Sequence, residues 1–127
     1  MGAAASVLTL SALGLLAFCV LAEVGQQLCF KAGSDRVPDG AGAVRGALAQ
    51  PLIWAGIALW AVEVVAWIMV LHRAPLSVAY PVMTLVYVGV PLGGALLLGE
   101  RMSARQISGA ALIAAGVFCV ALSGGAP

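Results

Sequence analysis

Residues 7–30 read VLTLSALGLLAFCVLAEVGQQLCF, and this stretch decides the class of fold. It carries one charged side chain, Glu23, in a run longer than the about 20 helical residues that cross a bilayer. The same criterion is met by three further apolar runs, at residues 51–71, 75–99 and 106–124. Because the alternating pattern of membrane β-strands is absent, each run can satisfy its backbone hydrogen bonds only as a helix. We therefore predict an all-α integral membrane protein with four transmembrane helices.

The composition of the whole chain points to the same class. Of the 127 residues, 63% are hydrophobic and 9% are charged, whereas soluble domains are about 45–50% apolar and about 25% charged. The net charge of +1 provides no basic surface for nucleic acid. We therefore expect one four-helix membrane domain over residues 1–127 and no nucleic-acid partner.

The links between the predicted helices indicate how the chain is oriented in the membrane. They are short apart from a polar, turn-rich loop at residues 31–50. The first and third links carry five Lys and Arg side chains, and the second carries one. The positive-inside rule then predicts that the first and third links are cytoplasmic and that both termini lie outside.

Two carboxylates, Glu23 and Glu63, lie inside the predicted membrane helices. A charge at mid-bilayer costs about 2.5–3.5 kcal/mol on insertion scales, so each of them indicates a functional role. Gln26 and Gln27 follow Glu23 at spacings of three and four, which places all three on one helical face. This face predicts a cavity in which the carboxylate binds a proton or a cation. The alternative is that a neighbouring glutamine holds Glu23 protonated and the group only joins helices.

Aromatic and hydroxyl side chains extend this predicted site. Trp60 and Trp67 flank Glu63 on one face, where their rings could hold an amine or a sugar, with plain packing or lipid contact as the alternative. The third predicted helix contributes the hydroxyl groups of Tyr80, Thr84 and Tyr87. Pro91 removes a backbone hydrogen bond from that helix, so we expect a bend there, either as a static kink or as a hinge.

Small residues predict where helices associate. Gly89, Gly93 and Gly94 lie beside Pro91 and allow close helix approach or movement. The fourth predicted helix has few polar side chains and several small ones, among them Gly109 and Gly116. It is therefore expected to be an association helix.

The residues of this fourth helix carry a resemblance to a known family. Residues 109–117, GAALIAAGV, resemble the GxxLIxxGV dimerisation motif of the small multidrug resistance family. The resemblance implies a dimer interface formed by Gly109, Leu112, Ile113, Gly116 and Val117. Glu23, with Lys31 eight residues beyond it, is similar to that family's first helix, in which the glutamate is the shared proton and cation site. Met83 stands where that family has a tryptophan that stacks aromatic drugs.

A closer likeness is to the two subunits of the aminoarabinose-phosphoundecaprenol flippase, which belong to the same drug/metabolite transporter superfamily. Residues 27–31, QLCFK, resemble the QLCQK of one subunit, and residues 78–81, VAYP, resemble its IAYP. Residues 71–73, LHR, resemble the LHK of the other subunit. The likeness extends over nearly the whole chain.

These resemblances imply a membrane transporter and not an enzyme. They imply a homodimer or heterodimer in the bacterial inner membrane that moves an undecaprenyl-phosphate-linked aminosugar by alternating access. Glu23 or Glu63 would receive the amine, and the aromatic rings would receive the sugar. The candidates for the phosphate headgroup are Lys31, Arg73 and Arg101, although cationic residues at helix ends often only snorkel to the interface or set topology.

Two other functions remain open at this point. Glu23 also fits a proton-coupled exporter of small organic cations, and the small size of the chain fits a non-transporting accessory subunit. The sequence contains no metal-ligand cluster, no nucleophile–base pair and no phosphate loop, so we expect no enzyme activity, no metal site and no cofactor.

Overall fold

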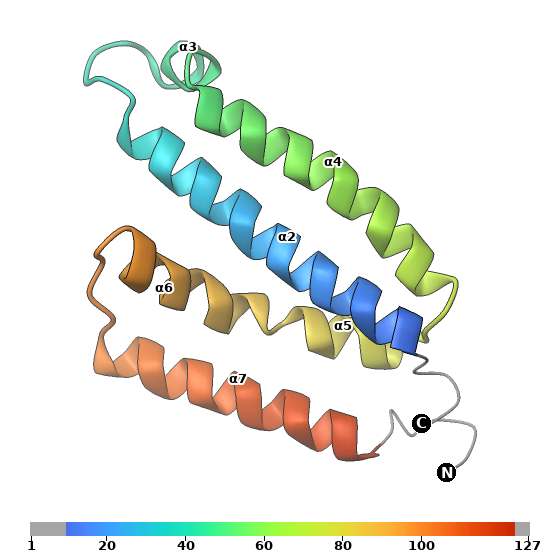
Figure 1. The fold of residues 1–127 in the computed structure, drawn as a ribbon. Coiled ribbons are helices and arrows are strands. Elements are labelled where there is room, and N and C mark those ends of the chain that lie inside the picture. Colours follow the sequence, from blue (N-terminus) through green and yellow to red (C-terminus); the bar gives the residue numbers. More distant parts are fainter. Residues whose placement is uncertain (1–9, 124–127) are drawn as a thin grey trace.

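The computed structural model describes residues 10–123, and these residues are mostly helical (Figure 1). The helices are α2 (Leu10–Asp35), α3 (Ala43–Leu48), α4 (Pro51–Leu71), α5 (Leu76–Met83), α6 (Val86–Leu97) and α7 (Ala104–Ser123). Four segments are long and apolar enough to cross a membrane: α2, α4, α5 together with α6, and α7. The prediction of an all-α protein with four membrane helices is confirmed. Residues 7–9 and 124 of the predicted spans lie outside the described residues.

The expected loop at residues 31–50 ends where it was predicted, at the start of α4, but it begins later than predicted and contains a short helix. α2 continues to Asp35, because Lys31 and Asp35 lie one turn apart and their side chains form an ion pair of 3.1 Å. α3 then forms a short helix before α4 begins. The indole Nε1 of Trp54 donates a hydrogen bond of 2.9 Å to the carbonyl of Leu48, which joins the end of α3 to α4.

The third span is interrupted at residues 84–85, between α5 and α6, as Figure 1 shows. The interruption thus lies before Pro91, the residue at which a bend was predicted, and α6 continues as a helix through Pro91. The helix is interrupted at residues 84–85 because the carbonyl of Pro81 takes other partners. It accepts hydrogen bonds from the Thr84 hydroxyl at 2.5 Å and from the Thr84 backbone N–H at 3.1 Å. The N–H of Leu85 binds the carbonyl of Val82 instead, at 3.1 Å, so the backbone tightens into a 3₁₀-type turn.

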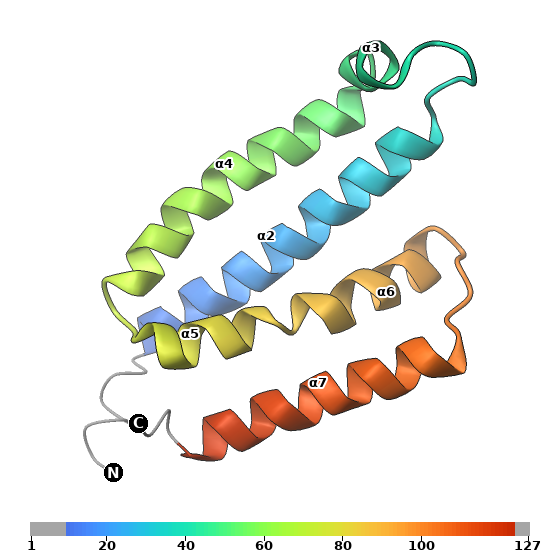
Figure 2. The ribbon, with the colours of Figure 1, turned by 180° about the vertical axis from the view of Figure 1, so that it is seen from behind.

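α2 is the central helix of the molecule. Figures 1 and 2 both show α4 antiparallel to α2 on one side and α5–α6 on the other, with α7 beyond them. α2 contacts α4, α5 and α6, whereas α7 packs on α5 and α6. Because the number of spans is even, α2 begins at the same end of the bundle at which α7 finishes.

Close contacts at glycine bring α2 and α4 together. A β-carbon placed on Gly56 would lie 2.5 Å from Cε1 of Phe30, and one placed on Gly33 would lie 2.9 Å from Cδ1 of Ile53. Association of helices in lipid depends on such packing, because the lipid tails remove the hydrophobic force between helices.

Close contacts at glycine also join α6 to α2. A β-carbon on Gly89 would lie 2.7 Å from Cγ2 of Val24, and one on Gly93 would lie 2.8 Å from Cδ1 of Leu28. The two glycines and the two side chains are each four residues apart, so one turn of α6 fits against one turn of α2. Gly89 and Gly93 therefore have a packing role in this structure.

α7 has no buried residue in the described part of the chain. A β-carbon on Gly109 or Gly116 would meet nothing within 4 Å, and Leu112 is 74% exposed. Ile113 and Val117 are half-buried. The predicted dimerisation residues thus lie on a helix that this chain leaves mostly uncovered.

The substitution Gly89→Leu tests the contact between α2 and α6. Val24 is β-branched and stiff, so the new side chain would overpack the interface and lower the free energy of unfolding by about 1–3 kcal/mol. Thermal unfolding of the purified protein in detergent measures the effect. Gly14→Leu is the control, because nothing lies within 4 Å of a β-carbon at Gly14. Equal stability of the two variants would contradict the role assigned to Gly89.

Candidate functional site

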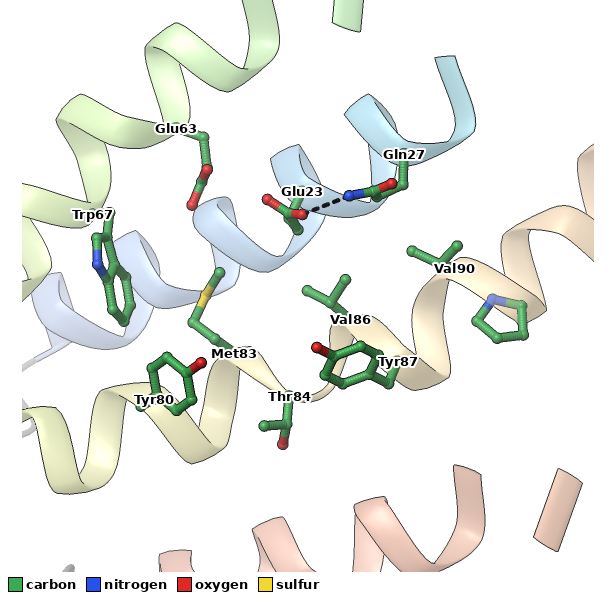
Figure 3. A pocket seen from close by; sticks show the side chains of 11 residues that line it. Glu23, Gln27, Glu63, Trp67, Tyr80, Met83, Thr84, Val86, Tyr87 and Val90 are labelled. Carbon is green, nitrogen blue, oxygen red and sulfur yellow. Dashed lines mark hydrogen bonds between the residues drawn. The ribbon is translucent and has the colours of Figure 1, made fainter. Parts of the chain in front are cut away.

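A cavity of about 630 Å³ lies between α2, α4, α5 and α6. Figure 3 shows its lining residues, which are Glu23, Gln27, Glu63, Trp67, Tyr80, Met83, Thr84, Val86, Tyr87, Val90 and Pro91. Its volume is in the range of about 300–1,000 Å³ that is usual for sites of small ligands. The structure therefore brings the predicted polar faces of three spans to one place.

The two intramembrane carboxylates face this cavity from neighbouring helices. Glu23 extends from α2 and Glu63 from α4, and Figure 3 shows both carboxyl groups directed into the same space. Glu63 is 7% exposed. The lining residues, all within 10–123, include no Lys, Arg or His. Two acidic groups without a basic partner favour the uptake of a proton or the binding of a cation.

Two glutamine amides hold the carboxylate of Glu23. Gln26 donates from Nε2 to Oε2 at 2.6 Å, and Gln27 donates from Nε2 to Oε1 at 3.0 Å, the bond drawn in Figure 3. Their positions three and four residues after Glu23 make both bonds possible within one turn of α2. Gln27 lines the cavity, whereas Gln26 is 4% exposed and supports Glu23 from inside the protein.

Aromatic rings form part of the wall of the cavity beside and across from the carboxylates. Trp67 lies beside Glu63 on the α4 side, and Tyr80 and Tyr87 lie on either side of the break between α5 and α6 (Figure 3). The hydroxyl of Thr84 is directed to the backbone, since it donates to the carbonyl of Pro81. The rings are thus available to stack on a ligand, and the Thr84 hydroxyl shapes the break.

Trp60 is not among the residues that line the cavity, and its side chain is 53% exposed. Helical spacing places Trp60 and Trp67 at nearly the same angle around α4, but seven residues separate them by about 10 Å along the axis. Spacing cannot show how far along a helix a cavity extends. The sequence could not identify Val86 and Val90 as cavity-lining residues, because many similar apolar side chains surround them in the chain.

The three candidates for a phosphate headgroup are divided between the two ends of the bundle. Lys31 is 3.1 Å from Asp35 and 3.6 Å from Glu100, so two carboxylates already compensate its charge. Arg101 is exposed at the same end of the bundle. Arg73 follows α4 at the opposite end, about 30 Å away along a helix of this length, and donates to the carbonyl of Met69. They cannot bind one phosphate together, and none of them lines the cavity.

Curated proteins from two bacteria are similar to the chain over most of its length. One from Salmonella paratyphi B is 31% identical to it, and one from Salmonella newport is 34% identical. Each match covers 106 residues, which are 82% of this chain and 91% of the relative. Both relatives are named "Probable 4-amino-4-deoxy-L-arabinose-phosphoundecaprenol flippase subunit ArnE". No family model and no solved structure matches the chain.

Cysteine labelling tests the extent of the cavity. In a background in which the three native cysteines are replaced by alanine, Trp67→Cys should react with a polar thiol reagent, because the carboxylates draw water into the cavity. Trp60→Cys is the matched control on the same helix and should stay unlabelled in the membrane, since its exposed side chain lies outside the cavity, where lipid would cover it. Labelling of both positions at similar rates would contradict the boundary drawn between them.

Proposed function

Because this chain belongs to the family of ArnE flippase subunits, we propose that it is a subunit that moves an undecaprenyl-phosphate-linked aminosugar across the membrane. The observation that carries the proposal is the identity of 31–34% over 91% of the length of these relatives. Its family makes the chain a membrane transporter and not an enzyme. Its four apolar helices together with its family make it a multi-pass protein of the bacterial inner membrane.

The charges of the cavity support a substrate with an amine. Glu23 and Glu63 offer two carboxylates to a cationic group, and no basic side chain competes for them among the lining residues that the structure describes. A lipid-linked aminosugar carries such a cation on its headgroup. The rings of Trp67, Tyr80 and Tyr87 provide surfaces for the sugar and cation–π contacts for the amine.

The size of the cavity supports binding of the headgroup alone. A volume of about 630 Å³ accommodates a sugar but not a long prenyl chain as well. The outer faces of the helices carry exposed apolar side chains such as Leu21, Val65 and Leu112, which suit contact with lipid. The prenyl tail would therefore remain in the bilayer while the polar headgroup crosses through the protein. Arg101 at one end and Arg73 at the other could each meet the phosphate when it reaches that interface.

A second four-helix subunit would complete the transport path. The relatives are named as subunits, and α7 leaves Gly109 and Gly116 uncovered. Small residues on a lipid-facing helix allow another helix to approach closely. We propose that α7 joins the chain to a like or related subunit, and that the two protomers rock against each other to expose the cavity on alternate sides.

Deletion of the gene in its source bacterium tests the proposal. We expect the aminosugar on the outer surface to be lost, and wild-type protein to restore it. The double variant Glu23→Gln/Glu63→Gln should reduce surface aminosugar by about tenfold or more, since loss of a buried charge partner costs about 2–5 kcal/mol. Mass spectrometry of surface lipids gives the measurement. Trp60→Phe is the control and should restore the wild-type level, and unchanged surface lipids after deletion would contradict the proposal.

The two carboxylates also support a second candidate function, the exchange of protons for small organic cations. Purified protein in liposomes with a pH gradient should then take up the cation and release protons, and Glu23→Gln should abolish both fluxes. Absence of exchange by the wild-type protein excludes this candidate. Transport of either substrate by the isolated homodimer would exclude the third possibility, a non-transporting accessory subunit.

A further inference from the structure

Gln26 combines a strong hydrogen bond with a buried polar atom that has no partner. Its Nε2 lies 2.6 Å from Oε2 of Glu23, and the residue is 4% exposed. Its Oε1 is buried and makes no hydrogen bond. A buried carbonyl oxygen without a donor carries a desolvation penalty, and rotation of this amide would break no hydrogen bond of the oxygen.

Both carboxyl oxygens of Glu23 serve as hydrogen-bond acceptors in this arrangement. A carboxylate only accepts hydrogen bonds, and both of its oxygens accept here, one from Gln26 and one from Gln27. Addition of a proton to Oε2 of Glu23 would change this geometry. The new O–H would face the NH₂ group of Gln26, so two donors would oppose each other while the acceptor of Gln26 remained unpaired.

We propose that the side-chain amide of Gln26 turns over when Glu23 takes up a proton, so that Gln26 is a positioning residue for both charge states of Glu23. A proton from the cavity adds to Oε2 of Glu23, and the bond from Nε2 of Gln26 breaks. The O–H of Glu23 then donates to Oε1 of Gln26. Rotation about the last torsion of glutamine exchanges the oxygen and the nitrogen without movement of the helix. Gln27 continues to donate to the other oxygen of Glu23.

A test of this inference has to separate the titration signal of Glu23 from the signals of the other titratable groups in the cavity. Glu63 of α4, Tyr80 of α5 and Tyr87 of α6 line the same cavity as Glu23. Glu63 is the other carboxyl group in the cavity, so its signal must be removed from that of Glu23. The inference concerns a proton and an amide, so it goes beyond the transport function and does not depend on the substrate.

Infrared difference spectroscopy between high and low pH tests the inference on the purified protein without substrate. The glutamine side-chain amides are labelled with ¹³C, and wild-type protein is compared with Glu63→Leu to separate the two carboxyl groups. We expect a protonated carboxyl band at low pH that Glu23→Gln removes. We also expect an amide band that shifts with the same pH midpoint and disappears in Gln26→Leu.

The variants Gln26→Leu and Gln27→Leu form the matched pair of this test. In Gln26→Leu the carboxyl band of Glu23 should move to higher wavenumber, because its O–H has lost the acceptor. Gln27→Leu should keep both the carboxyl band and the amide shift. A Glu23 band that titrates while the amide band stays constant would overturn the inference, as would the absence of any Glu23 titration. The spectra need no transport, so failure here is distinguishable from failure of the proposed function.

Discussion

The close packing of α2 against both of its neighbours is the contact on which the rest of the structure depends. Phe30 of α2 fills the space left by Gly56 of α4, and Val24 fills the space left by Gly89 of α6. In lipid these contacts have to come from shape, because no hydrophobic force drives apolar helices together. Since α2 is held on two sides, Glu23 lies at a fixed place between α4 and α6.

The polar cavity is the consequence of this arrangement. Glu23 and Glu63 belong to different helices, yet they face one space that no basic lining residue neutralises in the described part of the chain. Each carboxylate alone would be costly inside a membrane. Together with the rings of Trp67 and the two tyrosines they form a site that suits a cationic group attached to a ring. The break at residues 84–85 contributes by setting Tyr80 and Tyr87 on separate helices along its wall.

The charged end of the bundle at Lys31 has its groups paired within the protein, whereas the outer helix α7 is mostly exposed. Lys31 is paired with Asp35 and Glu100, so this ion cluster joins α2 to the link between α6 and α7. The charge of Lys31 is thereby compensated by carboxylates of the protein itself. α7, by contrast, contributes no buried residue among those described and exposes its small side chains. Among the described helices of the membrane bundle, α7 is thus the least covered, and it is the helix whose residues resemble a dimerisation motif.

The sequence by itself determined the four membrane helices and the shared helical face of Glu23 and its glutamines, because run length and helical spacing are properties of one segment. Spacing fixes the angle of a side chain around its own helix, but not the neighbour that it meets. Only the tertiary structure decided that Glu63 and Trp67 share the cavity of Glu23 while Trp60 does not. It also placed the interruption at Thr84, because that hydroxyl competes for a backbone carbonyl whose partners depend on the folded geometry.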